Sequence, residues 1–209
     1  MTCIIPLLNS HNPADHEELR YALRSLTLQG VTRCILVGGR PKWYTGDHIP
    51  HADYNPKFKE QNIRDKVLLG ASYIDGEFLY TQDDVYMMAP YAGVHNKGLL
   101  SQTLQGRNAH SSYYKSIANT IEAYGDVLDT DTHGPVIMDS KAVSVCYSEW
   151  KDFGQLFKTT YCHLNQVSSA YYPDAKIDTP PEPGRLYFST RMFKPWLRDY
   201  FPLASPFEK

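Results

Sequence analysis

Residues 62–87 read NIRDKVLLGASYIDGEFLYTQDDVYM, and this stretch contains a helix pattern followed by a strand pattern. Its apolar residues first recur at the spacing of one helix face, at Ile63, Val67, Ala71 and Ile74. Asp75-Gly76 ends this predicted helix, and residues 77–81 (EFLYT) form a short, mostly apolar run typical of a buried strand. A helix that leads into a buried strand is half of a βαβ unit, so the stretch predicts an α/β fold.

The same alternation occurs nearer the amino terminus. Residues 3–8 (CIIPLL) and 34–37 (CILV) predict two buried strands, and residues 13–29 between them carry a helical apolar stripe. Asn12 is the expected N-cap of that helix, with Pro13 at its first position. Strand, helix and strand in this order predict a parallel pair, and two such units in series predict a doubly wound sheet. The Pro- and Gly-containing loop at 38–56 is too long for a simple connection, which makes it a candidate ligand loop.

The rest of the chain predicts helices and then an irregular tail. Apolar spacing indicates one helix near 114–124 and two more within 140–164. The tail at 179–209 is rich in proline and aromatic residues, so it is expected to be an extended arm. We therefore predict a single Rossmann-like α/β domain over residues 1–178, with a mainly parallel central sheet flanked by helices, and an arm at 179–209 packed on the same domain.

Composition excludes some classes of protein. The chain has 209 residues and a formal net charge of -2, so no whole-protein field attracts a polyanion. Its four cysteines are scattered, without a C-x-x-C pair, and this pattern favours reduced thiols over a disulfide framework or a zinc knuckle. The first residues lack the basic start and the long apolar run of a signal peptide, and no stretch approaches membrane-spanning length. These features predict a cytoplasmic protein that does not insert into membranes.

Asp83 and Asp84 are the strongest chemical signal. They directly follow a predicted parallel strand, and ligands bind at the carboxyl ends of strands in open α/β sheets. Adjacent carboxylates repel each other unless a cation lies between them. Mn²⁺ or Mg²⁺ supplies such a cation and also binds diphosphate oxygens, so the pair predicts a metal site. The alternative is an acidic turn in which one aspartate caps the following segment.

The motifs of this region resemble a known group of enzymes. Residues 62–87 are similar to the core of nucleotide-diphosphosugar transferases of the GT-A fold, in which a strand ends in an acidic metal-binding motif. ELRYALRSL at 18–26, ILV at 35–37, FLYTQDDVYM at 78–87 and HGP at 133–135 also resemble the Stealth family of capsular-polysaccharide sugar-phosphate transferases. The closing FPLASPFE at 201–208 resembles that family too, whereas CIIPLLNSHN at the start does not match its first strand.

The resemblance implies a metal-dependent glycosyltransferase that moves a sugar from a nucleotide-sugar donor to a hydroxyl acceptor. Asp83 and Asp84 would hold the metal on the donor diphosphate, and Asp84 would take part in catalysis by neutralising the leaving group. Asn62, Arg64 and Lys66 precede the strand by one or two helical turns and are candidate contacts to donor phosphate or sugar. The alternative for Arg64 and Lys66 is a solvated helix face.

Four further residues are candidates for the site. Asn9, in the polar turn after the first strand, and Asp53, in the long loop, could contact the donor, although a plain loop aspartate is the alternative for Asp53. His133, fixed by a Gly-Pro turn, is a candidate third metal ligand or a structural histidine. Asp139 could be the general base for an acceptor hydroxyl, or the N-cap of the next helix.

The acceptor is the least determined part of the sequence prediction. The tail alternates cations and aromatics, so Arg191 and its neighbours could bind an acceptor by charge and stacking, or the aromatics could only anchor the arm. A glycan acceptor is favoured, and a modified nucleobase in DNA stays open. The competing functions are sugar-1-phosphate transfer, a non-catalytic nucleotide- or sugar-binding module and, last, a metallophosphoesterase, which needs more dispersed His and Asp ligands.

Overall fold

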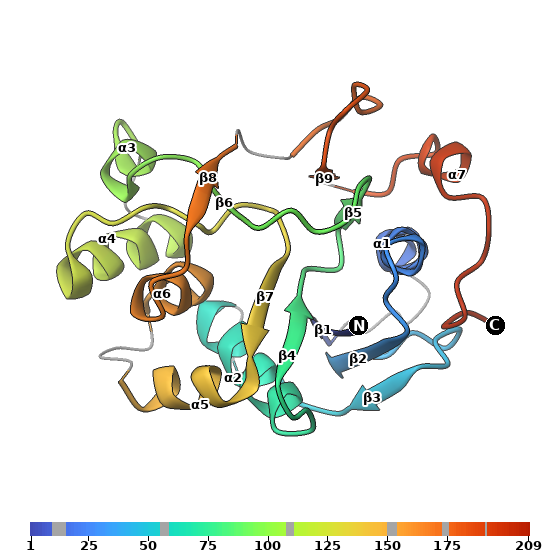
Figure 1. Ribbon diagram of the computed structural model, residues 1–209, viewed down its shortest axis with the longest axis horizontal. Coiled ribbons are helices and arrows are strands. Elements are labelled where there is room, and N and C mark those ends of the chain that lie inside the picture. Colours follow the sequence, from blue (N-terminus) through green and yellow to red (C-terminus); the bar gives the residue numbers. More distant parts are fainter. Residues whose placement is uncertain (10–15, 55–58, 108–110, 150–153, 173–175, 191) are drawn as a thin grey trace.

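The computed structural model describes the chain except for residues 10–15, 55–58, 108–110, 150–153, 173–175 and 191. Its centre is a five-stranded sheet in the order β3-β2-β1-β4-β7 (Figure 1). The sheet strands are β1 (Thr2–Leu7), β2 (Arg33–Gly38), β3 (Asp47–Ile49), β4 (Glu77–Tyr80) and β7 (Val136–Asp139). The first four run parallel, and β7 pairs with β4 in the antiparallel direction. The fold is therefore α/β with a mixed, mostly parallel sheet, as the periodicity predicts.

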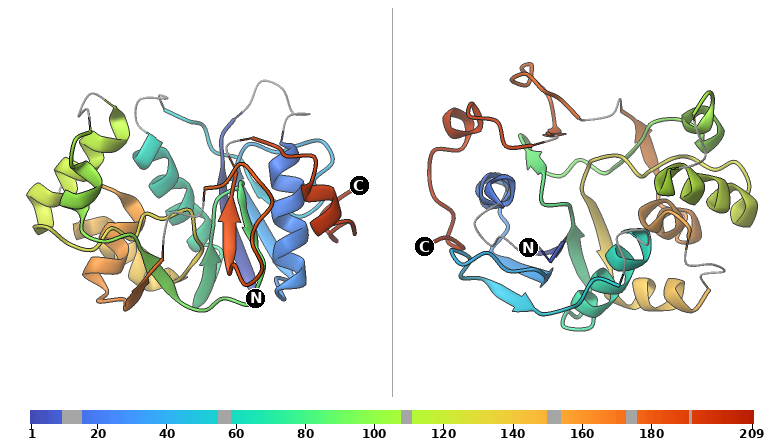
Figure 2. Two further views of the ribbon diagram at one scale, coloured as in Figure 1. Left: turned by 90° about the horizontal axis from the view of Figure 1, so that it is seen from above. Right: turned by 180° about the vertical axis from the view of Figure 1, so that it is seen from behind.

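Helices cover both faces of this sheet (Figure 2). One face is covered by α1 (Glu17–Leu28), and the other by α2 (Lys59–Ala71), α5 (Ser140–Glu149) and α6 (Phe157–Leu164). Side chains alternate along β1, so Ile5 packs with Leu23 of α1 whereas Ile4 packs with Val67 of α2. Burial on both faces explains why β1 and β2 are continuous apolar runs.

The predicted elements agree with these bounds. Strands expected at 3–8, 34–37 and 77–81 are β1, β2 and β4, and the stripe that begins at Ile63 is α2. The long loop at 38–56 contains the edge strand β3 in addition to irregular chain. The described part of the first helix begins at Glu17, and the predicted cap at Asn12 and Pro13 lies outside the described residues.

Beyond the sheet the chain makes shorter elements, as the change of pattern after residue 90 predicts. The additional helices are α3 (Leu100–Leu104), α4 (Ser112–Tyr124) and α7 (Leu197–Tyr200). The additional strands are β5 (Val85–Met87), β6 (Val94–Asn96), β8 (Ser169–Tyr171) and β9 (Tyr187–Ser189). The pair β6-β8 is parallel, and β5-β9 is antiparallel. No helix among the described residues is long and apolar enough to cross a membrane.

The arm at 179–209 runs back across α1 (Figure 1). Its strand β9 pairs with β5, so the arm is hydrogen-bonded to the segment that follows Asp84. Phe188, Leu197 and Phe201 are buried in a cluster with Tyr21 of α1. Near its end, Thr45 donates its backbone N–H to the carbonyl of Phe207 over 2.9 Å. The aromatic residues of the arm thus anchor it to the sheet domain.

Candidate functional site

The acidic pair lies at the carboxyl edge of the sheet. β4 ends at Tyr80, and Asp83 and Asp84 follow before β5 begins. The two strands are buried, which fixes the turn between them from both sides. Asp83 and Asp84 line a cavity of about 350 Å³. Four other residues predicted from the sequence line the same cavity, namely Asp53, Asn62, Lys66 and His133.

Electrostatics distinguish the two aspartates. Burial, together with repulsion from Asp84, raises the pKa of Asp83 to about 7. Among the described residues no ammonium or guanidinium forms an ion pair with Asp83. Asp84 has a partner, because the Nζ atom of Lys176 lies 3.7 Å from its Oδ2. Sequence analysis does not indicate Lys176, which precedes the arm and pairs with Ser189 of β9 through an isolated β-bridge.

The carboxylate oxygens of Asp83 and Asp84 fit a divalent cation. Phosphate oxygens of a substrate would complete its coordination. A half-buried carboxylate with a raised pKa and no ion-pair partner among the described residues is stabilised by a nearby positive charge. No three acidic, His or Cys side chains in the described residues are grouped closely enough to form a complete protein site. Mg²⁺ is commonly bound by one or two carboxylates plus substrate phosphates, so two aspartates suffice.

His133 is at the cavity but is not grouped with the acidic pair as a ligand. Its Nε2 atom lies 3.4 Å from the ammonium of Lys176, which is also the partner of Asp84. An ammonium thus occupies the space between His133 and Asp84. Asp83 and Asp84 therefore remain the candidate metal ligands, and His133 does not join them.

Lys66 and Asp53 form another part of the cavity wall, and Asn9, which does not itself line the cavity, hydrogen-bonds to Asp53. The buried ammonium of Lys66 donates to the carbonyl of Leu7 over 2.6 Å and also to Asp53. Asp53 accepts the backbone N–H of Asn9 over 2.8 Å and its side-chain amide over 3.0 Å. Burial alone would raise the pKa of Asp53, but the hydrogen bonds from Lys66 and Asn9 lower it. Lys66 and Asn9 thus position Asp53 as an ionised acceptor.

Gly38 makes this wall possible. Its φ is +110°, a conformation that favours glycine. A Cβ atom there would lie 2.2 Å from the carbonyl oxygen of Leu7 and 2.7 Å from the Nζ atom of Lys66. Only a residue without a side chain leaves room for Lys66 to cross the end of β2.

The side chain of Asn62 connects α2 to the long loop. Its Oδ1 atom accepts the backbone N–H of Tyr54 over 2.9 Å, and the residue is buried. Asn62 lies four residues before Lys66, so both side chains extend from the same face of α2.

Arg64, another predicted site residue, is not at this cavity. Arg64 lies on another face of α2, where it forms an ion pair with Asp65 over 3.0 Å and stacks on the ring of Tyr147. It is two residues from both Asn62 and Lys66, and two residues along a helix turn a side chain by more than half a circle. Arg191 lies outside the described residues.

The general-base interpretation of Asp139 is also replaced. Because β7 is antiparallel to β4, Val136 pairs with Tyr80 and Asp139 pairs with Glu77, at the opposite edge of the sheet from Asp83. The Oδ1 atom of Asp139 accepts the backbone N–H groups of Lys141 and Ala142 over 3.0 and 2.9 Å. These are the hydrogen bonds of a residue that caps α5, the alternative that the sequence left open.

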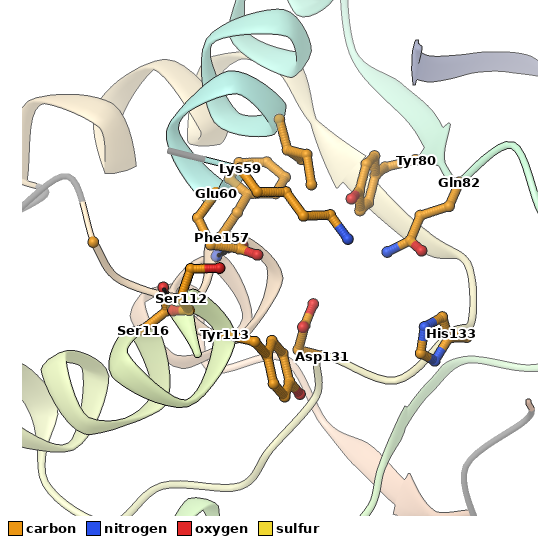
Figure 3. A pocket seen from close by; sticks show the side chains of 12 residues that line it. Lys59, Glu60, Tyr80, Gln82, Ser112, Tyr113, Ser116, Asp131, His133 and Phe157 are labelled. Carbon is orange, nitrogen blue, oxygen red and sulfur yellow. Dashed lines mark hydrogen bonds between the residues drawn. The ribbon is translucent and has the colours of Figure 1, made fainter. Parts of the chain in front are cut away.

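A second cavity, of about 240 Å³, adjoins the first. The two cavities share Lys59, Ile63, Gln82 and His133 as lining residues. Figure 3 shows the second cavity between α2 and α4, with Asp131 pointing into it. Glu60 also lines it, and burial, together with repulsion from Asp131, raises the pKa of Glu60 to about 7.

The loop that carries Asp131 and His133 is held from beneath by Lys158. This lysine is fully buried on α6, and its ammonium donates to the carbonyls of Thr132 and, over 2.9 Å, of Gly134. Burial lowers the pKa of Lys158. The sequence alone did not indicate Lys158, since its spacing on α6 resembles that of any helix residue and its partners are backbone atoms.

Asp129 holds the other end of that loop. It is fully buried, and its Oδ1 atom accepts the backbone N–H of Asp131 over 3.0 Å. Its Oδ2 atom accepts the hydroxyl of Thr103 over 2.8 Å and lies 3.4 Å from the ammonium of Lys97. The position of Asp131 therefore follows from fixed neighbours on both sides.

Comparison with known proteins adds no constraint to this geometry. No protein-family model matches the chain, and no curated protein matches it.

Proposed function

We propose that the protein is a metal-dependent glycosyltransferase that takes a sugar from a nucleotide-sugar donor. The observation that carries this proposal is the pair of adjacent carboxylates, Asp83 and Asp84, in a cavity at the carboxyl edge of a mostly parallel sheet. Open α/β sheets bind their ligands at this edge, and a divalent cation links a carboxylate pair to a diphosphate. A GT-A arrangement is part of the proposal.

Asp83 and Asp84 would hold Mn²⁺ or Mg²⁺, which supplies the positive charge that stabilises a departing diphosphate. The ammonium of Lys176, beside Asp84, adds a second positive charge at the same end of the cavity. Asn62 and Asp53 also line the cavity, where an amide and an ionised carboxylate can bind ribose or sugar hydroxyls. Lys66 positions Asp53 and does not itself need to contact the donor.

Glycosyl transfer and sugar-1-phosphate transfer both need a base for the acceptor hydroxyl. An acceptor hydroxyl loses a proton when it attacks, and the adjoining cavity contains carboxylates that accept protons. The reaction releases a nucleoside diphosphate if a glycosyl group moves and a nucleoside monophosphate if a sugar phosphate moves. Product identity therefore separates the two reactions.

We propose the cytoplasm as its location. All four cysteines are buried free thiols, which suits a reducing compartment, and donor and acceptor are then both taken from the same side of the membrane.

The test is incubation of the full chain with a panel of uridine- and guanosine-diphosphate sugars, with Mg²⁺ or Mn²⁺, followed by chromatography of the nucleotides. We expect nucleoside diphosphate to accumulate with metal and not with a chelator. The variant Asp84→Asn should abolish the release, while Asp75→Asn, at an exposed aspartate outside the cavity, should not change it. Release of nucleoside monophosphate would overturn glycosyl transfer, and no release from any donor would favour a binding module.

A further inference from the structure

The second cavity differs in character from the first. Its walls include the rings of Tyr80, Tyr113 and Phe157, and two carboxylates, those of Glu60 and Asp131, face each other across it. Tyr80 and Phe157 pack edge to face, with ring centroids 5.4 Å apart. The hydroxyl of Tyr113 accepts a hydrogen bond of 2.8 Å from Lys97, which fixes that ring. A rigid aromatic surface thus lies beside two strong hydrogen-bond acceptors.

We propose that this cavity binds the acceptor as a single neutral sugar ring, and that Asp131 is the catalytic base that takes the proton from its hydroxyl. This inference rests on the proposed function, because it assigns the second substrate of the same reaction. It places the glycan acceptor that the sequence favours in a particular cavity, as a single sugar ring, and it names a catalytic residue that the sequence did not indicate.

Size and charge favour a sugar over a base in nucleic acid. The volume of about 240 Å³ lies below the range of about 300–1,000 Å³ typical of sites for larger ligands, so it suits one ring. Sugar rings present apolar C–H faces to aromatic side chains and hydroxyl donors to carboxylates. A nucleic acid would bring phosphates toward Glu60 and Asp131, and such acceptors normally require a basic surface.

Position selects Asp131 over Glu60 as the base. Asp131 lines the second cavity on the same loop as His133, a residue that lines both cavities. In Figure 3 its carboxylate points between Glu60 on one side and Gln82 and His133 on the other. Glu60 instead accepts the backbone N–H of Phe157 over 3.3 Å.

Glu60 has the complementary role of holding the acceptor. Its raised pKa, caused by burial and by the charge of Asp131, leaves a substantial fraction protonated at neutral pH. A protonated carboxyl can donate a hydrogen bond to a sugar oxygen, whereas Asp131 accepts one. A donor at Glu60 and an acceptor at Asp131 can therefore orient one sugar ring between them.

In the proposed step the sugar moves from the nucleotide to the acceptor oxygen. The acceptor O–H bond breaks and its proton moves to the carboxylate of Asp131. The acceptor oxygen forms a bond to the anomeric carbon of the donor, and the bond from that carbon to the phosphate oxygen breaks. Its electron pair leaves with the nucleoside diphosphate, which remains in the first cavity.

The first test separates the two cavities by filling one of them. Ser112 lines the second cavity from an exposed position on α4, so Ser112→Trp fills the space without disturbing the core. Lys115→Trp, exposed on the same helix and outside the cavity, is the matched control. The probes are a panel of methyl hexopyranosides, observed by saturation-transfer NMR on the full chain with Mg²⁺ and uridine or guanosine diphosphate. We expect at least one glycoside to bind wild type and Lys115→Trp, and not Ser112→Trp.

The second test assigns the base. Asp131→Asn should still bind that glycoside, while transfer to it falls about 100-fold or more, as expected for loss of general-base catalysis. Glu60→Gln alters the binding of the acceptor, so its effect should appear mainly as a higher KM for the glycoside, in contrast to the loss of kcat in Asp131→Asn. Wild-type transfer by Asp131→Asn would overturn the assignment of the base.

The remaining outcomes separate this inference from the proposed function. If Mg²⁺ and a nucleoside diphosphate bind but no glycoside does, or if Ser112→Trp binds the glycoside like wild type, the sugar subsite is wrong and the donor site stands. Transfer to an oligonucleotide in place of the glycosides would also overturn the sugar assignment. If no nucleoside diphosphate binds to wild type, the proposed function itself fails.

Discussion

Around the two cavities, neighbouring groups decide whether the ionised form of a buried side chain is stabilised or destabilised. Lys66 and Lys158 are almost fully buried, and each ammonium donates to backbone carbonyls or to an aspartate. Asp83 and Glu60 have raised pKa values, each caused first by burial and then by a neighbouring carboxylate. Ionisable groups with shifted pKa values in a cavity are typical of sites that bind or transform a ligand.

The variant Glu60→Gln tests the raised pKa of Glu60. The pKa of Glu60 is about 7 in the folded protein and near 4.5 without burial, so the folded state binds more protons between these values. The free energy of unfolding of wild type should therefore fall as the pH rises from about 4.5 to about 7. Glu60→Gln removes this loss, so its stability relative to wild type should increase by about 3 kcal/mol between pH 4.5 and pH 8.

Urea denaturation at several pH values measures that difference. The groups that face Glu60 are Asp131, Lys59 and Lys158, and all remain in the variant. The exposed Glu122→Gln on α4 is the control and should follow the wild-type curve. Parallel curves for Glu60→Gln and wild type would show that Glu60 has an ordinary pKa.

Strand direction decides which loops meet at the site. The amino end of an antiparallel strand lies at the carboxyl edge of its parallel neighbours. The loop before β7 is therefore on the same side of the sheet as Asp83, whereas Asp139, at the carboxyl end of β7, is on the opposite side. This is why residues 129–135 contribute Asp131 and His133 to the cavities, whereas Asp139 caps α5.

Lys158→Met tests whether α6 holds that loop. The variant leaves the carbonyls of Thr132 and Gly134 without their ammonium donor, so the free energy of unfolding should fall by about 1–3 kcal/mol. Amide hydrogen exchange across residues 129–135 should become faster, because the loop loses its support. Lys141→Met, whose exposed ion pair with Asp75 measures 3.7 Å, should change neither quantity. Unchanged exchange in Lys158→Met would mean that the loop is held by other contacts.

Glu208→Gln tests how the arm is attached to α1. Glu208 accepts hydrogen bonds from Arg24 over 2.9 and 2.8 Å and from Arg20 over 3.0 Å, and its side chain is 2% exposed. Burial would raise its pKa, but the hydrogen bonds from Arg24 and other donors lower it. Its ionised form therefore stabilises the fold above the ordinary pKa of a glutamate, and this contribution is lost as the pH falls.

At pH 7, Glu208→Gln should lower the free energy of unfolding by about 2 kcal/mol. Below pH 4 the variant and wild type should approach each other, since Glu208 is then increasingly protonated in wild type. Thermal denaturation at pH 4 and pH 7 measures both effects, with the exposed Glu182→Gln in the arm as control. A constant difference at both pH values would argue against the ion pairs as its cause.

At the scale of the whole molecule, the sequence predicts the elements well and the site in part. Periodicity locates β1, β2, β4 and α2, because burial on one or two faces leaves a repeat of two or 3.6 residues. The adjacent acids could be placed at the sheet edge for the same reason. Sequence spacing could not place Arg64 or Asp139, since helix rotation and strand direction decide where those side chains lie.

The residues that sequence analysis missed share a physical cause. Lys158 and Lys176 reach the site from segments far along the chain, and their partners are backbone carbonyls or side chains more than twenty residues away. Asp131 is one of three acidic residues in a short stretch, and only the fold shows which of them faces a cavity. Long-range contacts of this kind leave no periodic pattern in a single sequence.

In the whole molecule, two adjoining cavities lie at one edge of the sheet, and carboxylates line each of them. Together they provide room for a donor and an acceptor. The most direct test of the central claim is calorimetric titration of uridine and guanosine diphosphate into the full chain, with Mg²⁺ and with a chelator. We expect one of these nucleotides to bind only with Mg²⁺, and the double variant Asp83→Asn/Asp84→Asn to lose that metal-dependent binding. Equal affinity with and without Mg²⁺, or in wild type and the double variant, would contradict a shared cation at Asp83 and Asp84.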